Sequence, residues 1–572
     1  MADQDDTSGK WTRRDLLKLG AATGSVILVA PYIVACKDGS TGKDETMVKN
    51  DPVNDGTEGM MPSGGMPGGS TAPQIPTGPL VTPFTVEMPV SPVKTPVASL
   101  TPSPDTSQFQ YYNQFPAKEY YDVDVKEFLH SYHPSLPLNK AWGYDGVMPG
   151  PLFKARYDAP MIVRFRNNLS PVSTGFGDPN IITHLHNGHT GSESDGFAGD
   201  FYASGKYKDH HYPHMLAGGD PREALGSLWY HDHRHDFTAA NTYKGLVGTF
   251  LLFDELDSND ETDTNSRALR LPSGNYDIPL FLADKQFDAN GALIFSQTNL
   301  NGFVGDRFTV NGVIQPFFKV ARRKYRFRLF NGGPSRWYGI KFSNGMSFEL
   351  IATDGNLLDT PTPLTRFVHA PAERFDIVVD FSQFPIGTQI VLQNDVAQTS
   401  GVGPSGTLTT PIQLMRFDVD SDAADPSQVP AILRPLPPIP TPAVTRNWQF
   451  NNMMGAWLVN GRLFDANRVD AVVKRGTVER WNLSSMGMWS HPIHIHLEEF
   501  RILPRGDAAL QAIERGRKDV VKLGTSMMGG LGIPSSASVI INFRDMLGKY
   551  MMHCHNTVHE DHGMSIRFDV VP

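Results

Sequence analysis

The segment of the chain best equipped for chemistry lies near the C-terminus, where one thiol stands between two histidines. His553, Cys554 and His555 are followed by His559 and Met564. Along a β-strand alternate side chains face opposite sides, so Cys554 points away from His553 and His555. Cys554, His559 and Met564, with one more histidine, make the His₂Cys set with a weak axial Met that is typical of a blue-copper electron-transfer site. His553 and His555 must then serve a second centre.

Three further histidine clusters supply partners for that second centre. They are Thr183-His-Leu-His-Asn-Gly188, Trp229-Tyr-His-Asp-His233 and His491-Pro-Ile-His-Ile-His496. Each contains a His-x-His pair, whose two rings share one face of an extended segment. With His553 and His555 the three pairs give eight histidines, and His491 and His559 remain for Cys554. Imidazole suits copper, iron, nickel and zinc alike, and eight ligands fit three coppers as two, three and three.

These four motifs occur in the order found in multicopper oxidases, and the chain resembles that family from about residue 80 to residue 572. Trp142-Gly-Tyr-Asp-Gly-Val-Met-Pro-Gly-Pro151 and Thr309-Val-Asn-Gly312 resemble the branch of bacterial spore-coat laccases and bilirubin oxidase. The resemblance implies four copper ions, one of type 1, one of type 2 and two of type 3. It also implies that dioxygen is reduced to water with four electrons.

The resemblance further implies which residues bind each ion. The expected type 1 ligands are His491, Cys554, His559 and Met564. The expected type 2 ligands are His184 and His494. The expected type 3 ligands are His186, His231 and His555 for one ion and His233, His496 and His553 for the other. A coordinating Met564 predicts a low-to-middle redox potential, in contrast to relatives that have Leu or Phe at this position.

One residue departs from the pattern of the family. Asn187 follows the second histidine of the first motif, where the family usually has Gly. Asn tolerates left-handed backbone better than other non-Gly residues. We therefore expect little change in the loop.

Two carboxylates are candidates for catalysis, because reduction of dioxygen to water needs protons as well as electrons. Asp195 and Glu560, which directly follows ligand His559, match places where the family branch resembles a proton-delivery arrangement. Each has a plainer interpretation. Asp195 precedes Gly196 and could be a turn residue, and Glu560 could be a hydrogen-bond acceptor that orients a ligand.

The resemblance favours a laccase-like oxidase of phenols and aromatic amines. The alternative is a metallo-oxidase of Cu(I) or Mn(II), which several methionines of the last part of the chain favour: Met453, Met454, Met486, Met488, Met527 and Met528. A copper-free protein with the same fold would have lost ligands. Here the ten expected histidine ligands, Cys554 and Met564 are all present. A copper nitrite reductase would have two domains and fewer His-x-His pairs.

The N-terminus predicts export. Thr12-Arg-Arg-Asp-Leu-Leu-Lys18 is a twin-arginine pattern, and the stretch from Leu19 to Ala35 carries no charge. Ile33-Val-Ala-Cys36 resembles a lipobox, so residues 1–36 are expected to be a signal whose Cys36 carries a lipid at the periplasmic or cell-surface membrane. The alternatives are ordinary cleavage near Ala35 and an uncleaved membrane anchor. The chain has two cysteines, so with Cys554 committed to copper no disulfide is expected.

Residues 37–78 are rich in Gly, Pro, Ser and Thr and predict a disordered linker. Its Met60, Met61 and Met66 could load Cu(I) or simply belong to a solvated linker. The net charge of −9 and the lack of a basic stripe argue against a nucleic-acid partner. We expect a monomer.

The remaining residues are too many for one core and suit three domains. Short β-rich runs, such as Met161–Arg166 and Ser538–Phe543, alternate with Gly, Pro and Asn turns. We therefore predict an all-β fold of three cupredoxin-like Greek-key sandwiches, at 79–260, 270–420 and 443–572. The middle domain has no ligand motif and is expected to be a spacer, so the three-copper cluster should form between the first and third domains.

Overall fold

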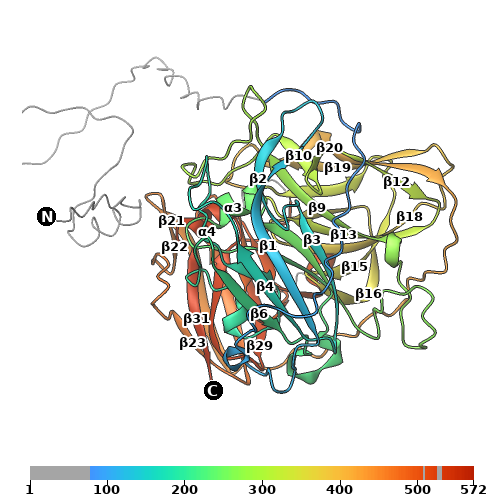
Figure 1. Cartoon of the computed structure of the whole chain (residues 1–572). Coiled ribbons are helices and arrows are strands. Elements are labelled where there is room, and N and C mark those ends of the chain that lie inside the picture. Colours follow the sequence, from blue (N-terminus) through green and yellow to red (C-terminus); the bar gives the residue numbers. More distant parts are fainter. Residues whose placement is uncertain (1–77, 507–508, 525–530) are drawn as a thin grey trace, which may run out of the picture. The chain divides into compact units, whose positions relative to one another are not determined.

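The computed structural model describes residues 78–506, 509–524 and 531–572. The predicted export signal, Cys36 and the linker up to residue 77 lie outside the described residues, as do Met527 and Met528. Within the described ranges no helix is long and apolar enough to span a membrane. Strands dominate these ranges and form six sheets, so the all-β prediction is confirmed (Figure 1).

No sheet combines named strands from more than one of three consecutive segments, which we call the first third (119–253), the middle third (277–421) and the last third (444–571). Residues Pro76–Pro572 nevertheless pack as one unit. The three domain boundaries drawn from the sequence therefore stay a prediction, which the strand pairing supports.

The first third has two four-stranded sheets, with the orders β2-β1-β4-β6 and β3-β8-β7-β5. Alternation of buried and half-buried residues along β1 shows that one of its faces is covered, whereas β8 is buried throughout. Strands β5 and β7 are paired so that His184 lies opposite His231. The elements are β1 (Glu119–His130), β2 (Asn139–Tyr144), β3 (Gly150–Arg156), β4 (Met161–Asn167), β5 (Thr183–His186), α2 (Ser192–Asp195), β6 (Tyr207–Tyr212), β7 (Ser227–Asp232), α3 (Thr238–Lys244) and β8 (Val247–Phe253), with short 3₁₀ turns at Thr106–Gln108, Ala217–Gly219 and Pro221–Glu223.

The middle third has a seven-stranded sheet of order β11-β10-β9-β13-β18-β15-β16 and a five-stranded sheet of order β12-β20-β19-β14-β17. Phe327, Phe342 and Phe417 lie in the core of this third. The elements are β9 (Asp277–Lys285), β10 (Arg307–Val310), β11 (Val313–Ile314), β12 (Phe317–Ala321), β13 (Lys324–Asn331), β14 (Tyr338–Phe342), β15 (Phe348–Thr353), β16 (Asn356–Leu364), β17 (Arg366–His369), β18 (Arg374–Asp380), β19 (Gln389–Ala397) and β20 (Gly406–Ser421), with a 3₁₀ turn at Gly274–Tyr276.

The last third has sheets of order β22-β21-β24-β29-β26-β27 and β23-β31-β30-β25-β28. Its core contains Trp457 and Trp481 and also takes in Cys554 and Met564. The elements are β21 (Val444–Met453), β22 (Ala456–Val459), β23 (Ala471–Lys474), β24 (Thr477–Ser485), β25 (His491–Ile495), β26 (Phe500–Ile502), β27 (Arg517–Lys518), β28 (Val520–Leu523), β29 (Ser536–Phe543), β30 (Gly548–Cys554), α4 (Thr557–Asp561) and β31 (Ser565–Val571), with a 3₁₀ turn at Ala512–Glu514.

A small apolar cluster joins the three thirds beside the histidine motifs. It contains Trp229 of the first third, Phe281 and Phe330 of the middle third, and Val520 of the last third. Burial of such large apolar side chains favours association of the three segments. The motifs of the first and last thirds are thereby held against each other.

Candidate metal centres

Cys554 and two histidines form a compact group of donor atoms. Cys554 Sγ lies 3.4 Å from His491 Nδ1 and 3.7 Å from His559 Nδ1, and the two Nδ1 atoms lie 3.2 Å apart. His559 Nε2 bonds to the backbone oxygen of Asn301 at 3.0 Å, and its ring stacks on Trp457 with centroids 3.6 Å apart. These contacts fix the ring so that Nδ1 faces the thiol, as second partners do for histidines that bind metals.

Met564 is the axial ligand that the sequence predicts. It is fully buried in the same apolar cluster as Cys554. The backbone N–H of Cys554 donates to Met564 O at 3.0 Å, and the N–H of Met564 donates to His559 O. The turn through α4 therefore returns Met564 to the strand that carries Cys554. Its role as a ligand remains a prediction.

The other eight predicted ligands gather in a second group, which we call the histidine cluster: His184, His186, His231, His233, His494, His496, His553 and His555. They come from β5, β7, β25 and β30 or from the residues directly after those strands. All are buried. The cluster therefore combines two strands of the first third with two of the last third.

Close ring contacts cross between the two thirds. The His184 ring stacks on His496 with centroids 4.0 Å apart, and the His186 ring stacks on His494 at 3.7 Å. His553 Nε2 lies 3.3 Å from His233 Nε2 and 3.2 Å from His496 Nε2. The last set matches one of the two expected type 3 ligand sets.

The chemistry of these donors fits metal ions. Burial lowers the pKa of His231 and of His491 to about 3, so these two rings are neutral and keep a lone pair. Several ring nitrogens, including Nε2 of His184, His231 and His494, have no hydrogen-bond partner in the structure. Because an unpaired buried nitrogen is costly, an ion bound at this point would satisfy it.

The thiol points to the same conclusion. Burial raises the pKa of Cys554 well above its ordinary value, so the thiol stays protonated and unreactive without a bound cation. A coordinating cation deprotonates a thiol outright. Neutral imidazoles, a thiol and a buried Met are soft or borderline ligands that suit copper.

Both predicted carboxylates contact the histidine cluster. His184 Nδ1 bonds to the backbone oxygen of Asp195, and His496 Nδ1 bonds to Asp195 Oδ2 at 2.8 Å. Burial raises the pKa of the Asp195 carboxyl to about 6. Asp195 also ends the helix α2, and a Cβ on Gly196 would lie 2.3 Å from the oxygen of Thr183. The turn interpretation and the contact with the cluster therefore both hold.

Glu560 contacts a different pair of cluster histidines. Its Oε2 lies 3.0 Å from His553 Nδ1, and its Oε1 lies 3.3 Å from His233 Nε2. Thr238 Oγ1 donates to Glu560 Oε1 at 3.0 Å. Glu560 therefore contacts two rings of the cluster, and its proton role stays a prediction.

A third buried carboxylate, Asp519, was missed in the sequence. Its Oδ2 lies 3.3 Å from His186 Nε2, and its backbone oxygen accepts from His494 Nδ1 at 3.0 Å. In the sequence it is one charge in Arg517-Lys-Asp519, a run that ordinarily predicts a solvated surface. The only signal was its position directly before the apolar strand β28.

Asn187 does more than replace a glycine. Its φ of 70° is left-handed, as the sequence predicted. Its Nδ2 donates to the backbone oxygen of Asp354 at 2.7 Å and to Glu499 Oε1 at 2.9 Å. A glycine could adopt this backbone but could not make either bond.

The remaining histidines lie outside both groups, and most bind to backbone oxygens. His210, His211, His214 and His369 contact Ser194, Phe115, Ala159 and Glu373, respectively. His189 pairs with the Asp545 carboxylate at 2.9 Å. These bonds tie the rings to backbone and carboxylate oxygens outside both groups of donors.

Comparisons with known proteins identify the arrangement. Two family models, each described as multicopper oxidase, match residues 130–257 and 436–572. The chain is 37% identical over 504 residues to bilirubin oxidase of Albifimbria verrucaria, covering 85% of this chain and 81% of that protein. It is 30% identical over 532 residues to a laccase of Bacillus subtilis, covering 82% and 97%.

Solved structures agree. The McoA multicopper oxidase of Aquifex aeolicus aligns with a TM-score of 0.68 at 26% identity, covering 80% of this chain and 97% of that one. The predicted cupredoxin-like fold is therefore confirmed. The chain belongs to the multicopper oxidase family, whose four coppers, one of type 1, one of type 2 and two of type 3, couple the oxidation of a donor to the reduction of dioxygen.

Proposed function

We propose that this chain is a laccase-like oxidase that takes single electrons from phenolic or aromatic amine donors beside Cys554 and uses them to reduce dioxygen at the histidine cluster. The observation that carries the proposal is the placement of strand β30. Cys554 faces His491 and His559, while its neighbours His553 and His555 lie in the histidine cluster. A single peptide strand therefore connects the two groups through covalent bonds.

We assign the ligands as the sequence predicted. His491, Cys554, His559 and Met564 hold the type 1 ion, and His184 and His494 hold the type 2 ion. The two type 3 ions take His186, His231 and His555, and His233, His496 and His553. Copper, when bound, supplies one-electron redox chemistry at the first site and binding and reduction of dioxygen at the cluster.

Asp195 and Glu560 are proposed to hold and deliver protons to the cluster. Both are buried, and each contacts two cluster histidines. Asp195→Asn and Glu560→Gln should slow reoxidation of the reduced enzyme by dioxygen and leave its reduction by the donor unchanged. Stopped-flow absorbance separates the two half-reactions. Equal rates of reoxidation in variant and wild type would reject the proton role.

The electron donor is best identified by a direct comparison of turnover with different classes of donor. Oxygen uptake by the copper-loaded enzyme should be compared on a dimethoxyphenol, an aromatic amine, bilirubin, Cu(I) and Mn(II). Bilirubin is included because one relative of the chain is a bilirubin oxidase. Substantial turnover with the metal ions alone would refute the laccase-like proposal.

A metallo-oxidase is the second candidate, and one observation favours it. Met453, Met454, Met486 and Met488 are more than half exposed, at 55%, 86%, 51% and 54%. The Met486 N–H donates to Phe450 O in β21, the strand that ends at Met453. Exposed thioethers can bind Cu(I). Replacing Met486 and Met488 with Leu should lower Cu(I) oxidation selectively if this candidate is correct.

We further propose that the chain is exported by the twin-arginine route and anchored through a lipid on Cys36, as a periplasmic or cell-surface monomer. The support is the sequence of residues 12–36. Mass spectrometry of the mature N-terminal peptide tests it. An acylated N-terminal Cys36 is expected, and an unmodified terminus after Ala35 would refute the anchor.

A further inference from the structure

Two aspartates occupy equivalent places in the histidine cluster. Asp195 offers its backbone oxygen to His184 and its carboxylate to His496, and those two rings are stacked. Asp519 offers its backbone oxygen to His494 and lies with its carboxylate 3.3 Å from His186, and those two rings are also stacked. Each aspartate therefore contacts one histidine of the first third and one of the last third.

Asp519 differs from Asp195 in being held from outside the ligand-bearing segments. Arg374 of the middle third donates from Nη1 to Asp519 Oδ1 at 2.6 Å and from Nη2 to Asp519 Oδ2 at 2.9 Å. The same guanidinium donates to the backbone oxygens of Ser227, Asp354 and Ala372. A forked pair of this kind fixes the plane of a carboxylate as well as its position.

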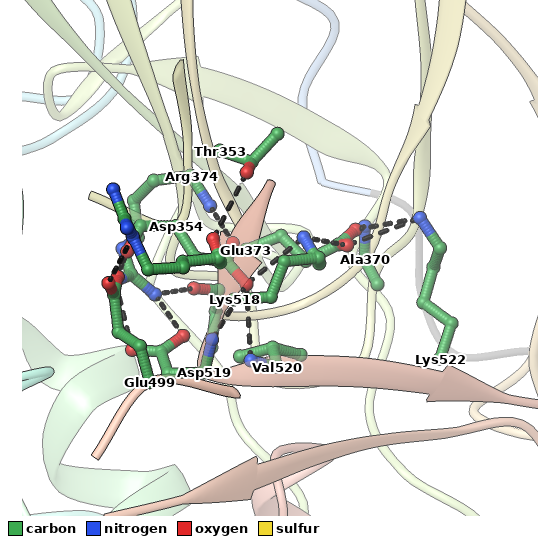
Figure 2. A network of polar contacts seen from close by, with 12 residues as sticks. Thr353, Asp354, Ala370, Glu373, Arg374, Glu499, Lys518, Asp519, Val520 and Lys522 are labelled. Carbon is green, nitrogen blue, oxygen red and sulfur yellow. Dashed lines mark hydrogen bonds and ion pairs between the residues drawn. The ribbon is translucent and has the colours of Figure 1, made fainter. Parts of the chain in front are cut away.

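The forked pair of Arg374 and Asp519 belongs to a larger buried charge network (Figure 2). The backbone N–H groups of Asp519 and Val520 both donate to Asp354 Oδ2, at 3.2 and 3.1 Å. Lys518 Nζ pairs with Asp354 at 3.0 Å and with Glu373 at 2.9 Å. Six charged side chains thus join the middle third to the segment Arg517–Leu523. The acids are Asp354, Glu373 and Asp519, and the bases are Arg374, Lys518 and Lys522.

We propose that Asp519 is a positioning residue for His186 and His494, and that the middle third keeps it in place through Arg374. Each carboxylate oxygen accepts one bond from the guanidinium, and Oδ2 also lies 3.3 Å from His186 Nε2, so we assign Asp519 to orienting these ligands. The backbone oxygen of Asp519 fixes His494 Nδ1 as the protonated nitrogen, which leaves the unpartnered Nε2 for an ion. The middle third has no ligand motif of its own, yet it takes part in assembly of the cluster. This inference rests on the histidine cluster binding copper.

The test uses Asp519→Asn and Arg374→Lys in the copper-loaded enzyme. Asp519→Asn keeps the shape of the side chain but loses its charge, and Arg374→Lys keeps the charge but loses the fork. Asp277→Asn is the matched control. Asp277 and Arg328 form an equally buried forked pair, at 2.7 Å for both bonds, and neither bond involves a cluster histidine. The readouts are copper per protein, the type 2 electron paramagnetic resonance signal and the blue absorption of the Cys554 site.

We expect Asp519→Asn to lower type 2 copper affinity or the rate of dioxygen reduction by about 10- to 100-fold, with an altered type 2 signal and an unchanged blue absorption. Arg374→Lys should give a smaller change of the same kind, and it supplies the readout should Asp519→Asn not fold. The control should keep all three readouts. A type 2 signal and a rate equal to those of the wild type in both variants would overturn the proposal. So would a loss of blue absorption that parallels the loss of type 2 copper, or an equal loss of type 2 copper in Asp277→Asn. Copper content and donor oxidation of the wild type test the proposed function separately.

Discussion

Glu373→Gln tests the energetics of the buried charge network. Burial alone would raise the pKa of the Glu373 carboxyl, but the ammonium groups of Lys518 and Lys522 lower it from 4.5 to about 2. A decrease of this size corresponds to about 3 kcal/mol, at about 1.4 kcal/mol per pKa unit. Truncating one partner of a buried ion pair costs about 3–5 kcal/mol by a separate route. We therefore expect the amide to destabilise the folded protein by about 3 kcal/mol at pH 7.

The dependence on pH gives this prediction its sign. The folded-state pKa lies below the unfolded value, so the stabilisation is present above pH 4.5 and is lost as the pH falls towards 2. The difference in unfolding free energy between wild type and Glu373→Gln should shrink to about 2 kcal/mol at pH 3.5 by the same linkage relation. Urea titrations at both pH values measure it.

Glu255→Gln is the control for this prediction. Glu255 pairs with Arg267, but both side chains are about 70% exposed, at 69% and 72%. An exposed pair contributes less than about 1 kcal/mol. A difference below about 1 kcal/mol for Glu373→Gln at pH 7, or one that does not change with pH, would contradict the reasoning.

Three further predictions concern the metal centres and their loop. Cys554→Ser should abolish the blue absorption and donor oxidation but retain copper in the histidine cluster, and a blue or active variant would overturn the type 1 assignment. Asn187→Gly keeps the left-handed backbone but removes two amide hydrogen bonds, so urea denaturation should show a loss of about 1–3 kcal/mol; an unchanged midpoint would dismiss those bonds. Removal of copper by a chelator should lower the melting temperature in calorimetry, and reloading should restore it, because the ions bind only the folded state.

The candidate copper ligands could be recognised because their chemistry is local in the sequence. A His-x-His pair places two rings on one face of a strand whatever the rest of the chain does, and the spacing of Cys554, His559 and Met564 is set by a single turn. The β-rich runs were equally readable, since Met161–Arg166 lies in β4 and Ser538–Phe543 in β29. These features depend on period and residue type alone.

Asp519 could not be predicted because its role depends on residues far away in the chain. It reaches His494, 25 positions earlier, and Arg374, 145 positions earlier. Charged residues in a sequence normally indicate a solvent-exposed surface. They are buried at low cost only where a partner of opposite charge is held in a fixed geometry. No local pattern marks that partner. The middle third lacks ligand motifs, and its contacts with the cluster are likewise distant in the chain. The sequence therefore predicts only a spacer there.

Stability alone does not explain why so many charges lie between the middle third and the cluster. Buried ion pairs pay a desolvation cost that often cancels their attraction, and apolar packing of equal volume can be as stable or more stable. What apolar side chains lack is direction. The fork of Arg374 fixes the carboxylate of Asp519, and the backbone of Asp519 fixes His494, so the orientation of one ring is set from another third of the chain. The network is therefore better explained by the geometry that it imposes on the histidines than by its contribution to folding.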